Sequence, residues 1–380
     1  MALALADLLR EHWLGYARAN AAHLHADHYR AVRRVLACRT PEMGGRLYRC
    51  GDCQRTHFAY HSCNHRNCPQ CGALDQQIWS AKQEARLLPV PYFMVTFTIP
   101  SQLRSLCLGQ PRVLYDLLLR CSAAALRDIV ATKTGAPEAR IGSTAVLHTW
   151  GRQMQDHPHV HHIVPAVAFD ADKGRLIHPD KAPFLVHYAP LAARFRSLLH
   201  QALRDQHPDI YQNLSADQRR DLAPATKWNV QLQHVGRGQT ALRYLARYVQ
   251  RSAFAPSRLL GYDSDGKVLL RWTSSSTGKT AVMRLHPHEF MRRWLLHVLP
   301  KGLTRIRHYG FLSSAAGTTR TRIRVLLGAT MNEPPPELPE VKPFVCDHCG
   351  GSLTFLREIA RPHPLRGPPA QPSMLSTQPQ

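Results

Sequence analysis

HPHVHHIV, at residues 157–164, is the stretch that organises the chain, and apolar residues continue from it to Phe169. Their density predicts a buried strand. Side chains two apart share a strand face, so His159 and His161 point the same way and Val160 points the opposite way. Two imidazoles side by side on a strand are typical of a metal site. A chain with 23 histidines can also carry such a pair at its surface or in its core, so the motif alone leaves both interpretations open.

A second motif, YLARY at residues 244–248, predicts an amphipathic helix with an apolar stripe that includes Leu242 and Leu245. The four-residue spacing puts Tyr244 and Tyr248 on one helix face, one turn apart. On the adjoining face a basic row repeats at the same spacing: Arg243, Arg247 and Arg251. The two tyrosines could be nucleophiles, with the arginine row binding DNA beside them. The same pattern is equally typical of tyrosine rings packed in a core beside a solvated face of arginines.

The charge balance points to a polyanionic partner. Lys and Arg number 49 against 26 Asp and Glu, which leaves a net charge of +23. Basic surface gains affinity by releasing counterions condensed on nucleic acid. No apolar run reaches about 18 residues, and the first 14 residues predict a helix rather than a signal peptide, so we expect no membrane association. We expect a cytoplasmic protein whose ten cysteines stay reduced, as metal ligands or small core residues.

Cysteine spacing predicts a structural zinc site near the N-terminus. Two Cys-x-x-Cys knuckles, separated by 14 residues, match a four-thiolate zinc ribbon formed by Cys50, Cys53, Cys68 and Cys71. Cys63 is a further potential ligand, and nearby histidines leave other sets of four open. So short a unit buries little core, so the zinc would supply much of its folding free energy. We expect this module to position DNA rather than to catalyse.

A third knuckle, Cys346-x-x-Cys349, lies within a Pro-rich tail. One knuckle supplies half a zinc site. It can bind an ion together with His348 or His363, dock on the first module, or hold no metal. From about residue 362 the composition predicts disorder.

The hydropathy pattern predicts an α+β fold, with an antiparallel sheet and helices on its faces. Strands are expected at 92–100, 143–150, 228–234 and 304–309, and helices at 103–132, 191–204 and 287–299. Hairpins are expected around 170–174 and between 267–272 and 280–285. We divide the chain into N-terminal helices with the zinc module (1–88), a main domain (89–330) and a Pro-rich tail (331–380).

Taken in this order, the motifs resemble those of the double-tyrosine HUH transposases of bacterial rolling-circle insertion sequences. The resemblance rests on residues 62–71, 157–164, 243–249 and 289–310 and covers most of 45–312. It implies an antiparallel HUH nuclease sheet with the histidines on a central strand and the tyrosines on a neighbouring helix. The divalent-ion ligands of the family fall on His159 and His161, and its paired tyrosines on Tyr244 and Tyr248. For a third ligand, the candidates are Gln153, His157 and Gln233.

The resemblance further implies a transposase that nicks and rejoins single-stranded or hairpin DNA ends of a mobile element. A tyrosine would form a 5′-phosphotyrosine link with the help of Mg²⁺ or Mn²⁺, and no nucleotide cofactor would be needed. The oligomeric state stays open. Three alternatives remain: a plasmid relaxase or replication initiator, a non-catalytic zinc protein that binds nucleic acid, and a zinc hydrolase that uses His157, His159 and His161.

Overall fold

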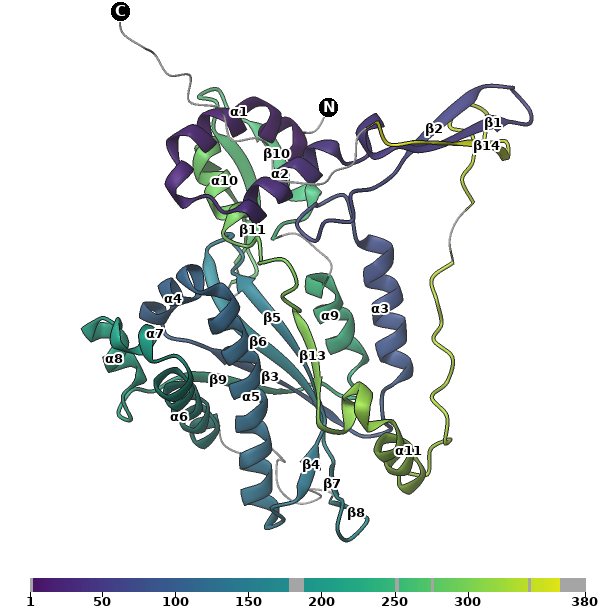
Figure 1. The fold of residues 1–380 in the computed structure, drawn as a ribbon. Helices are drawn as coiled ribbons and strands as arrows, with labels where there is room; N and C mark the ends of the chain where they lie inside the picture. Colours follow the sequence, from purple (N-terminus) through teal and green to yellow (C-terminus); the bar gives the residue numbers. More distant parts are fainter. Residues whose placement is uncertain (1–2, 178–187, 250–252, 275–276, 341–342, 363–380) are drawn as a thin grey trace, which may run out of the picture. The chain divides into compact units, whose positions relative to one another are not determined.

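The computed structural model divides the chain into two compact units (Figure 1). Unit 1 comprises residues 1–73, 250–298 and 340–380, and unit 2 comprises 74–249 and 299–339. The structure describes residues 3–177, 188–249, 253–274, 277–340 and 343–362, without the side chains of 247–249. Unit 1 therefore combines three separate segments of the chain. Within the described residues, no helix is both long and apolar enough to cross a lipid bilayer.

Unit 2 is built on a five-stranded antiparallel sheet of order β13-β5-β6-β3-β9. The five strands are β3 (Tyr92–Thr98), β5 (Ser143–Trp150), β6 (Asp156–Pro165), β9 (Asn229–His234) and β13 (Ile306–Tyr309). The histidine strand β6 is central, paired on one side with β5 and on the other with β3. This sheet confirms the α+β prediction.

Alternation along β6 sends its side chains into two different cores. Val160 and Val164 pack in the cluster that contains helices α5 (Pro111–Thr134) and α6 (Tyr188–Gln206). Ile163, on the opposite face, packs in the cluster that contains Leu242 and Leu245 of helix α9 (Gln239–Val249). Figure 1 shows α5 and α9 on either side of the sheet. His159 and His161 therefore share the face covered by α9.

The predicted continuous strand from residue 157 to Phe169 is wrong at Pro165. Strand β6 ends there, and β7 (Ala168–Asp170) joins a separate sheet of order β4-β7-β8. Proline has no backbone N–H for the ladder, and the N–H of Val167 instead donates to the Pro165 carbonyl at 2.8 Å. The predicted hairpin around 170–174 is confirmed by the pairing of β7 with β8 (Arg175–Ile177).

Among the described residues, the other α-helices and strands of unit 2 are β4 (Ala139–Ile141), α4 (Arg104–Gly109), α7 (Pro208–Gln212), α8 (Ala216–Leu222), α11 (Gly317–Leu326) and α3 (Ala73–Ala85), whose first residue belongs to unit 1.

The described residues of unit 1 form three α-helices and two small antiparallel sheets. The helices are α1 (Leu5–Ala19), α2 (Ala26–Ala37) and α10 (Pro287–Leu295). One sheet joins β10 (Leu259–Tyr262), β11 (Val268–Thr273) and β12 (Thr280–Leu285), so the predicted hairpin is confirmed. The other sheet, of order β14-β1-β2, pairs the hairpin β1 (Gly45–Cys50) and β2 (Thr56–Tyr60) with β14 (Leu353–Ile359). Strand β14 lies in the Pro-rich tail, before the part expected to be disordered, and was not among the predicted strands.

Candidate functional site

Three histidines converge on the α9 face of the unit 2 sheet. His159 and His161 come from β6, and His148 comes from the neighbouring strand β5, opposite His159 in the register. One ligand nitrogen from each ring lies within 4.8 Å of the other two. The ring centroids of His148 lie 5.0 Å from His159 and 4.4 Å from His161. We call these three residues the histidine cluster.

His148 is the site residue that the sequence reasoning missed. The strand that carries it was predicted, but only the register of β5 against β6 places it beside His159. Of the three expected candidates, His157 has its ring 5.0 Å from that of His159 but lies outside the group of mutually close nitrogens. Gln153 and Gln233 stay untested predictions, with Gln233 on β9 opposite Met94 of β3.

Hydrogen bonds orient two of the imidazoles. Nδ1 of His159 lies 2.6 Å from the His157 carbonyl, which can only accept, so Nδ1 carries the proton and Nε2 keeps its lone pair. Nδ1 of His161 lies 2.8 Å from Oγ1 of Thr96, directly across from it on β3. Partners of this kind fix the ring orientation of metal-ligating histidines.

Burial keeps the cluster uncharged. It lowers the pKa of His159 to about 4 and holds the pKa values of His148 and His161 well below the ordinary value of 6.5. At neutral pH the rings are therefore neutral, which is the form that binds a metal ion. Three neutral imidazoles with converging nitrogens fit a divalent ion.

The neighbouring His162 has a different role, because it points to the α5 face. Its Nε2 lies 2.9 Å from Oγ of Ser122 on α5, and its Nδ1 lies 3.1 Å from Oγ of Ser143 on β5. Burial lowers its pKa to about 3. Both ring nitrogens of His162 therefore have partners inside the core, and these contacts hold β6 in place on the face opposite the histidine cluster.

Tyr244 lies beside the histidine cluster. Helix α9 buries Leu242 and Leu245 against the sheet and leaves Tyr244 half-buried, with its ring centroid 6.3 Å from that of His161 at 90°. The predicted helix is confirmed and runs through residue 248, so the two tyrosines are one turn apart along it. The side chains of Tyr248 and Arg247 are not among those described, and Arg251 lies outside the described residues.

Arg243 points away from the core, and its guanidinium pairs with Glu84 of α3 at 2.8 Å. Its side chain is 69% exposed, so the pair contributes little to stability and leaves the charge available at the surface.

An open groove runs over the edge strand β9 on the histidine face of the sheet. Its lining includes Thr96, which orients His161, and three polar residues of β9: Asn229, Gln231 and Gln233. The register pairs Thr96 with Gln231, so these side chains share the face that carries the histidine cluster.

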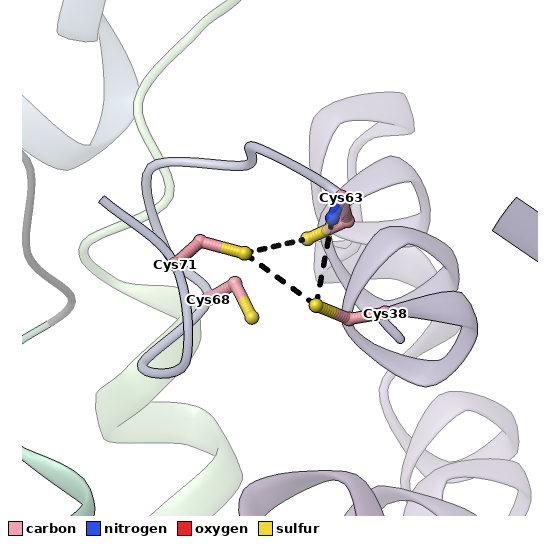
Figure 2. Close-up of side chains that lie close together, drawn as sticks. All are labelled: Cys38, Cys63, Cys68 and Cys71. Atoms are coloured by element: carbon pink, nitrogen blue, oxygen red, sulfur yellow. Dashed lines mark hydrogen bonds between the residues drawn. The ribbon is translucent and has the colours of Figure 1, made fainter. Parts of the chain in front are cut away.

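In unit 1, four buried cysteines form a compact thiol group (Figure 2). Cys38 caps the end of α2, and Cys63, Cys68 and Cys71 come from the loop that follows β2. Sγ of Cys71 lies 3.4 Å from that of Cys38 and 3.7 Å from that of Cys63. A tetrahedral zinc ion with bonds of about 2.3 Å separates its sulfurs by roughly 3.8 Å, so the group fits zinc. We call it the proximal cysteine group.

The prediction of one ribbon from Cys50, Cys53, Cys68 and Cys71 is wrong in its grouping. Cys50 and Cys53 lie in a second group with Cys346 and Cys349, which we call the distal cysteine group. The reason is the β1–β2 hairpin: Cys50 and Cys53 lie at its turn, whereas Cys63 follows its open end. A five-residue strand such as β2 spans about 17 Å, too far for one ion. Cys63, expected only as a further ligand, is a full member of the proximal group.

Replacing Cys71 with Ser should remove zinc from the proximal group and destabilise unit 1. Structural zinc contributes about 10–16 kcal/mol in small zinc-finger peptides, and three thiolates hold the ion far less tightly than four. Zinc content and thermal unfolding of the purified chain measure the effect. Cys121→Ser, in the core of unit 2, is the matched control and should keep its zinc. Unchanged zinc in the Cys71 variant would contradict the assignment.

Comparison with known proteins gives the class first. A family model described as "Putative transposase" matches residues 142–320, and one described as "Transposase zinc-binding domain" matches residues 8–99. The first range contains the histidine cluster and α9, and the second contains the proximal cysteine group. The chain is therefore a transposase with a zinc-binding module.

Two relatives that align over most of their length show to which family of transposases the chain belongs. "Putative transposase y4qJ" of Sinorhizobium fredii (strain NBRC 101917 / NGR234) is 35% identical over 344 residues, 87% of this chain and 85% of the relative. "Transposase for insertion sequence element IS801" of Pseudomonas savastanoi pv. phaseolicola is 27% identical over 352 residues, 87% of this chain and 83% of the relative. The chain belongs to the IS91-type insertion-sequence transposases. No solved structure matches it significantly. Family membership makes DNA its partner and DNA strand transfer its reaction class, and it confirms the resemblance drawn from the motifs.

Proposed function

We propose that this transposase nicks and rejoins single-stranded DNA at the ends of its insertion sequence through a 5′-phosphotyrosine intermediate, in support of rolling-circle transposition. The observation that carries the proposal is the position of Tyr244, half-buried beside His161 of the histidine cluster. A nucleophile next to three neutral imidazoles is suited to attack on a metal-bound phosphodiester. The reaction belongs in the bacterial cytoplasm, at the nucleoid, where the DNA lies.

In the proposed reaction, the metal ion would activate the phosphate and the protein would supply the nucleophile. Mg²⁺ or Mn²⁺ held by His148, His159 and His161 would polarise the scissile phosphate and stabilise charge on the leaving 3′ oxygen. The phenol oxygen of Tyr244 forms the new bond to phosphorus as the bond to the 3′ oxygen breaks, which leaves a free 3′-OH. The phenol gives up its proton to solvent as it attacks, and the departing 3′ oxygen takes up a proton to become the 3′-OH. Tyr248, one turn along α9, would hold the second strand.

The energy of the broken bond is kept in the tyrosine–DNA link, so rejoining needs no nucleotide cofactor. The net charge of +23 supplies affinity for the DNA backbone. The groove beside Thr96, with polar side chains of β9, offers a path along which a single strand can reach the histidine cluster. Arg243, with Arg247 and Arg251 further along the sequence, would contact phosphates.

The direct test uses end-labelled single-stranded DNA from the insertion-sequence ends, incubated with the purified chain and Mn²⁺ and run on denaturing gels. A protein–DNA adduct and a new 3′-OH fragment are the expected products, more abundant from single-stranded or hairpin DNA than from duplex DNA. Cleavage without an adduct would overturn the proposal.

A zinc hydrolase is the second candidate, and the three-imidazole donor set favours it, because three histidines with an open position also suit catalytic zinc. That enzyme would turn over with Zn²⁺ and water and would leave no adduct. The gel therefore separates the two functions.

Thr96→Val should weaken the metal site without touching the nucleophile. It removes the hydroxyl that orients the His161 ring, and losses of such outer partners cost roughly 10–100-fold in metal affinity or activity. We expect cleavage to fall by that factor at low Mn²⁺ and to recover at high Mn²⁺. Thr132→Val, at a surface position of α5, is the control. A loss that excess metal does not restore would contradict this role.

A further inference from the structure

The distal cysteine group lies at the turn of the β1–β2 hairpin and combines residues from both ends of the chain. Sγ of Cys50 lies 3.5 Å from that of Cys349, and Sγ of Cys53 lies 3.6 Å from that of Cys346. All four sulfurs lie within 4.8 Å of one another. We infer that these four thiolates form a second structural zinc site, whose two halves are 293 residues apart in sequence.

Both halves have the backbone of a zinc knuckle. At the first, the N–H of Cys50 donates to the Arg55 carbonyl at 2.9 Å, which closes the turn that carries Cys53. At the second, the N–H of Cys346 donates to the Gly351 carbonyl and the N–H of Gly350 donates to the Cys346 carbonyl, each at 2.9 Å. Gly350 has φ +77°, which favours glycine. Two such turns that face each other are the arrangement of a zinc ribbon.

Strand β14 brings the second knuckle to the first. It pairs with β1 from Gly45↔Ile359 to Cys50↔Leu353, and the N–H of Gly51 donates to the Ser352 carbonyl at 3.1 Å. The approach is close: a Cβ on Gly351 would lie 3.2 Å from Sγ of Cys50. The strand pairing thus ends at the thiol group.

Hydrophobic burial does not explain why the sheet of β14, β1 and β2 is stably folded. No residue of β2 or β14 is buried, and β1 is buried only at its two ends. Phe58 and Phe355 are 57% and 50% exposed. Three short strands without a core are marginal in water, so a cross-link at the turn must supply stability that packing does not. A tetrathiolate zinc ion at this position would supply it.

His57 lies beside the distal cysteine group and contacts one of its ligands. Nε2 of His57 lies 3.2 Å from Sγ of Cys346, and its Nδ1 lies 3.1 Å from a carboxylate oxygen of Asp347. Side chains around a metal site hold its ligands in place in this way. The site therefore has four sulfur ligands and one histidine that acts through a ligand.

The second site extends the zinc-binding module beyond residues 8–99, the range that the zinc-binding family model matches. Cys50 and Cys53 lie within residues 8–99, whereas Cys346 and Cys349 lie outside both matched ranges. The N-terminal module is therefore complete only when the C-terminal knuckle is present.

The test is the zinc content of the purified full-length chain, measured by elemental analysis. The double variant Cys346→Ser/Cys349→Ser should lose one zinc ion per chain relative to the wild type. Cys107→Ser/Cys121→Ser, two buried cysteines of unit 2, is the matched control and should lose none. Cys38→Ser/Cys71→Ser should lose one ion independently, and the two losses should add. Wild-type zinc content in the Cys346/Cys349 variant would overturn the inference.

Two further measurements decide the case if the double variant misfolds. Cys349→His keeps four ligands, so it should retain the ion. After replacement of zinc by Co²⁺ in both sites, its thiolate-to-cobalt charge-transfer absorption should be about one eighth weaker than that of the wild type. One of the eight thiolate ligands in the two sites has then been replaced by an imidazole. Intact mass under non-reducing conditions should show all four cysteines as thiols once the metal is removed. A cobalt spectrum equal to that of the wild type, or a disulfide between the two knuckles, would overturn the site.

Discussion

Replacing Tyr244 and Tyr248 together with Phe should abolish the covalent protein–DNA adduct and reduce cleavage by roughly 10⁴-fold or more, the scale seen when a catalytic nucleophile is removed. The Phe side chain keeps the ring that packs beside His161 and removes only the oxygen that attacks phosphorus. The fold and the affinity for DNA should therefore be unchanged. The measurement is adduct formation with labelled single-stranded DNA, alongside binding by gel shift.

Tyr211→Phe is the matched control, because Tyr211 is a partly buried tyrosine of unit 2 whose hydroxyl bonds to His200 at 3.0 Å, away from the histidine cluster. The single variants identify the order of action: the tyrosine whose loss prevents the first cut acts first. An adduct that survives in the double variant would place the nucleophile elsewhere on the chain.

Replacing His161 with Ala should lower metal-dependent cleavage by about 10³-fold, because metal stabilisation of a phosphoryl transition state contributes several kcal/mol. Binding of DNA should persist, since it depends on the basic surface and not on the ion. Cleavage rates across a Mn²⁺ titration, with binding measured separately, test both halves of this expectation.

The same series tests the composition of the histidine cluster. His148→Ala should cost as much as His161→Ala, and His157→Ala should cost less, because His157 lies outside the group of converging nitrogens. His200→Ala, on α6, is the control. A larger loss for His157→Ala than for His148→Ala would assign the third-ligand position to His157 instead.

Local periodicity explains which parts of the site could be predicted. Alternation along a strand put His159 and His161 on one face, and the four-residue spacing put Tyr244 and Tyr248 on one helical face. Neither rule contains information on pairing between distant segments. His148 therefore stayed unrecognised, because only the register of β5 against β6 brings it to the cluster.

The cysteines show the same limit. Spacing identified each knuckle, but it joined the two that are nearest in sequence. In the structure the β1–β2 hairpin separates those two, and Cys38, which belongs to no Cys-x-x-Cys pair, completes one group. Strand β14 comes from a β-forming segment, Leu353–Ile359, but no strand was predicted there because prolines dominate the composition on either side of it.

The pairing of β1 with β14 also sets the order in which the protein can fold during translation. Strand β1 leaves the ribosome roughly 300 residues before its partner, a delay of about 15 to 60 s at 5–20 residues per second. Until β14 has been made, the edge of β1 with which it pairs lacks its strand partner. A messenger truncated before its last forty codons would yield a polypeptide whose N-terminal sheet stays incomplete, although every residue of the histidine cluster had already been made.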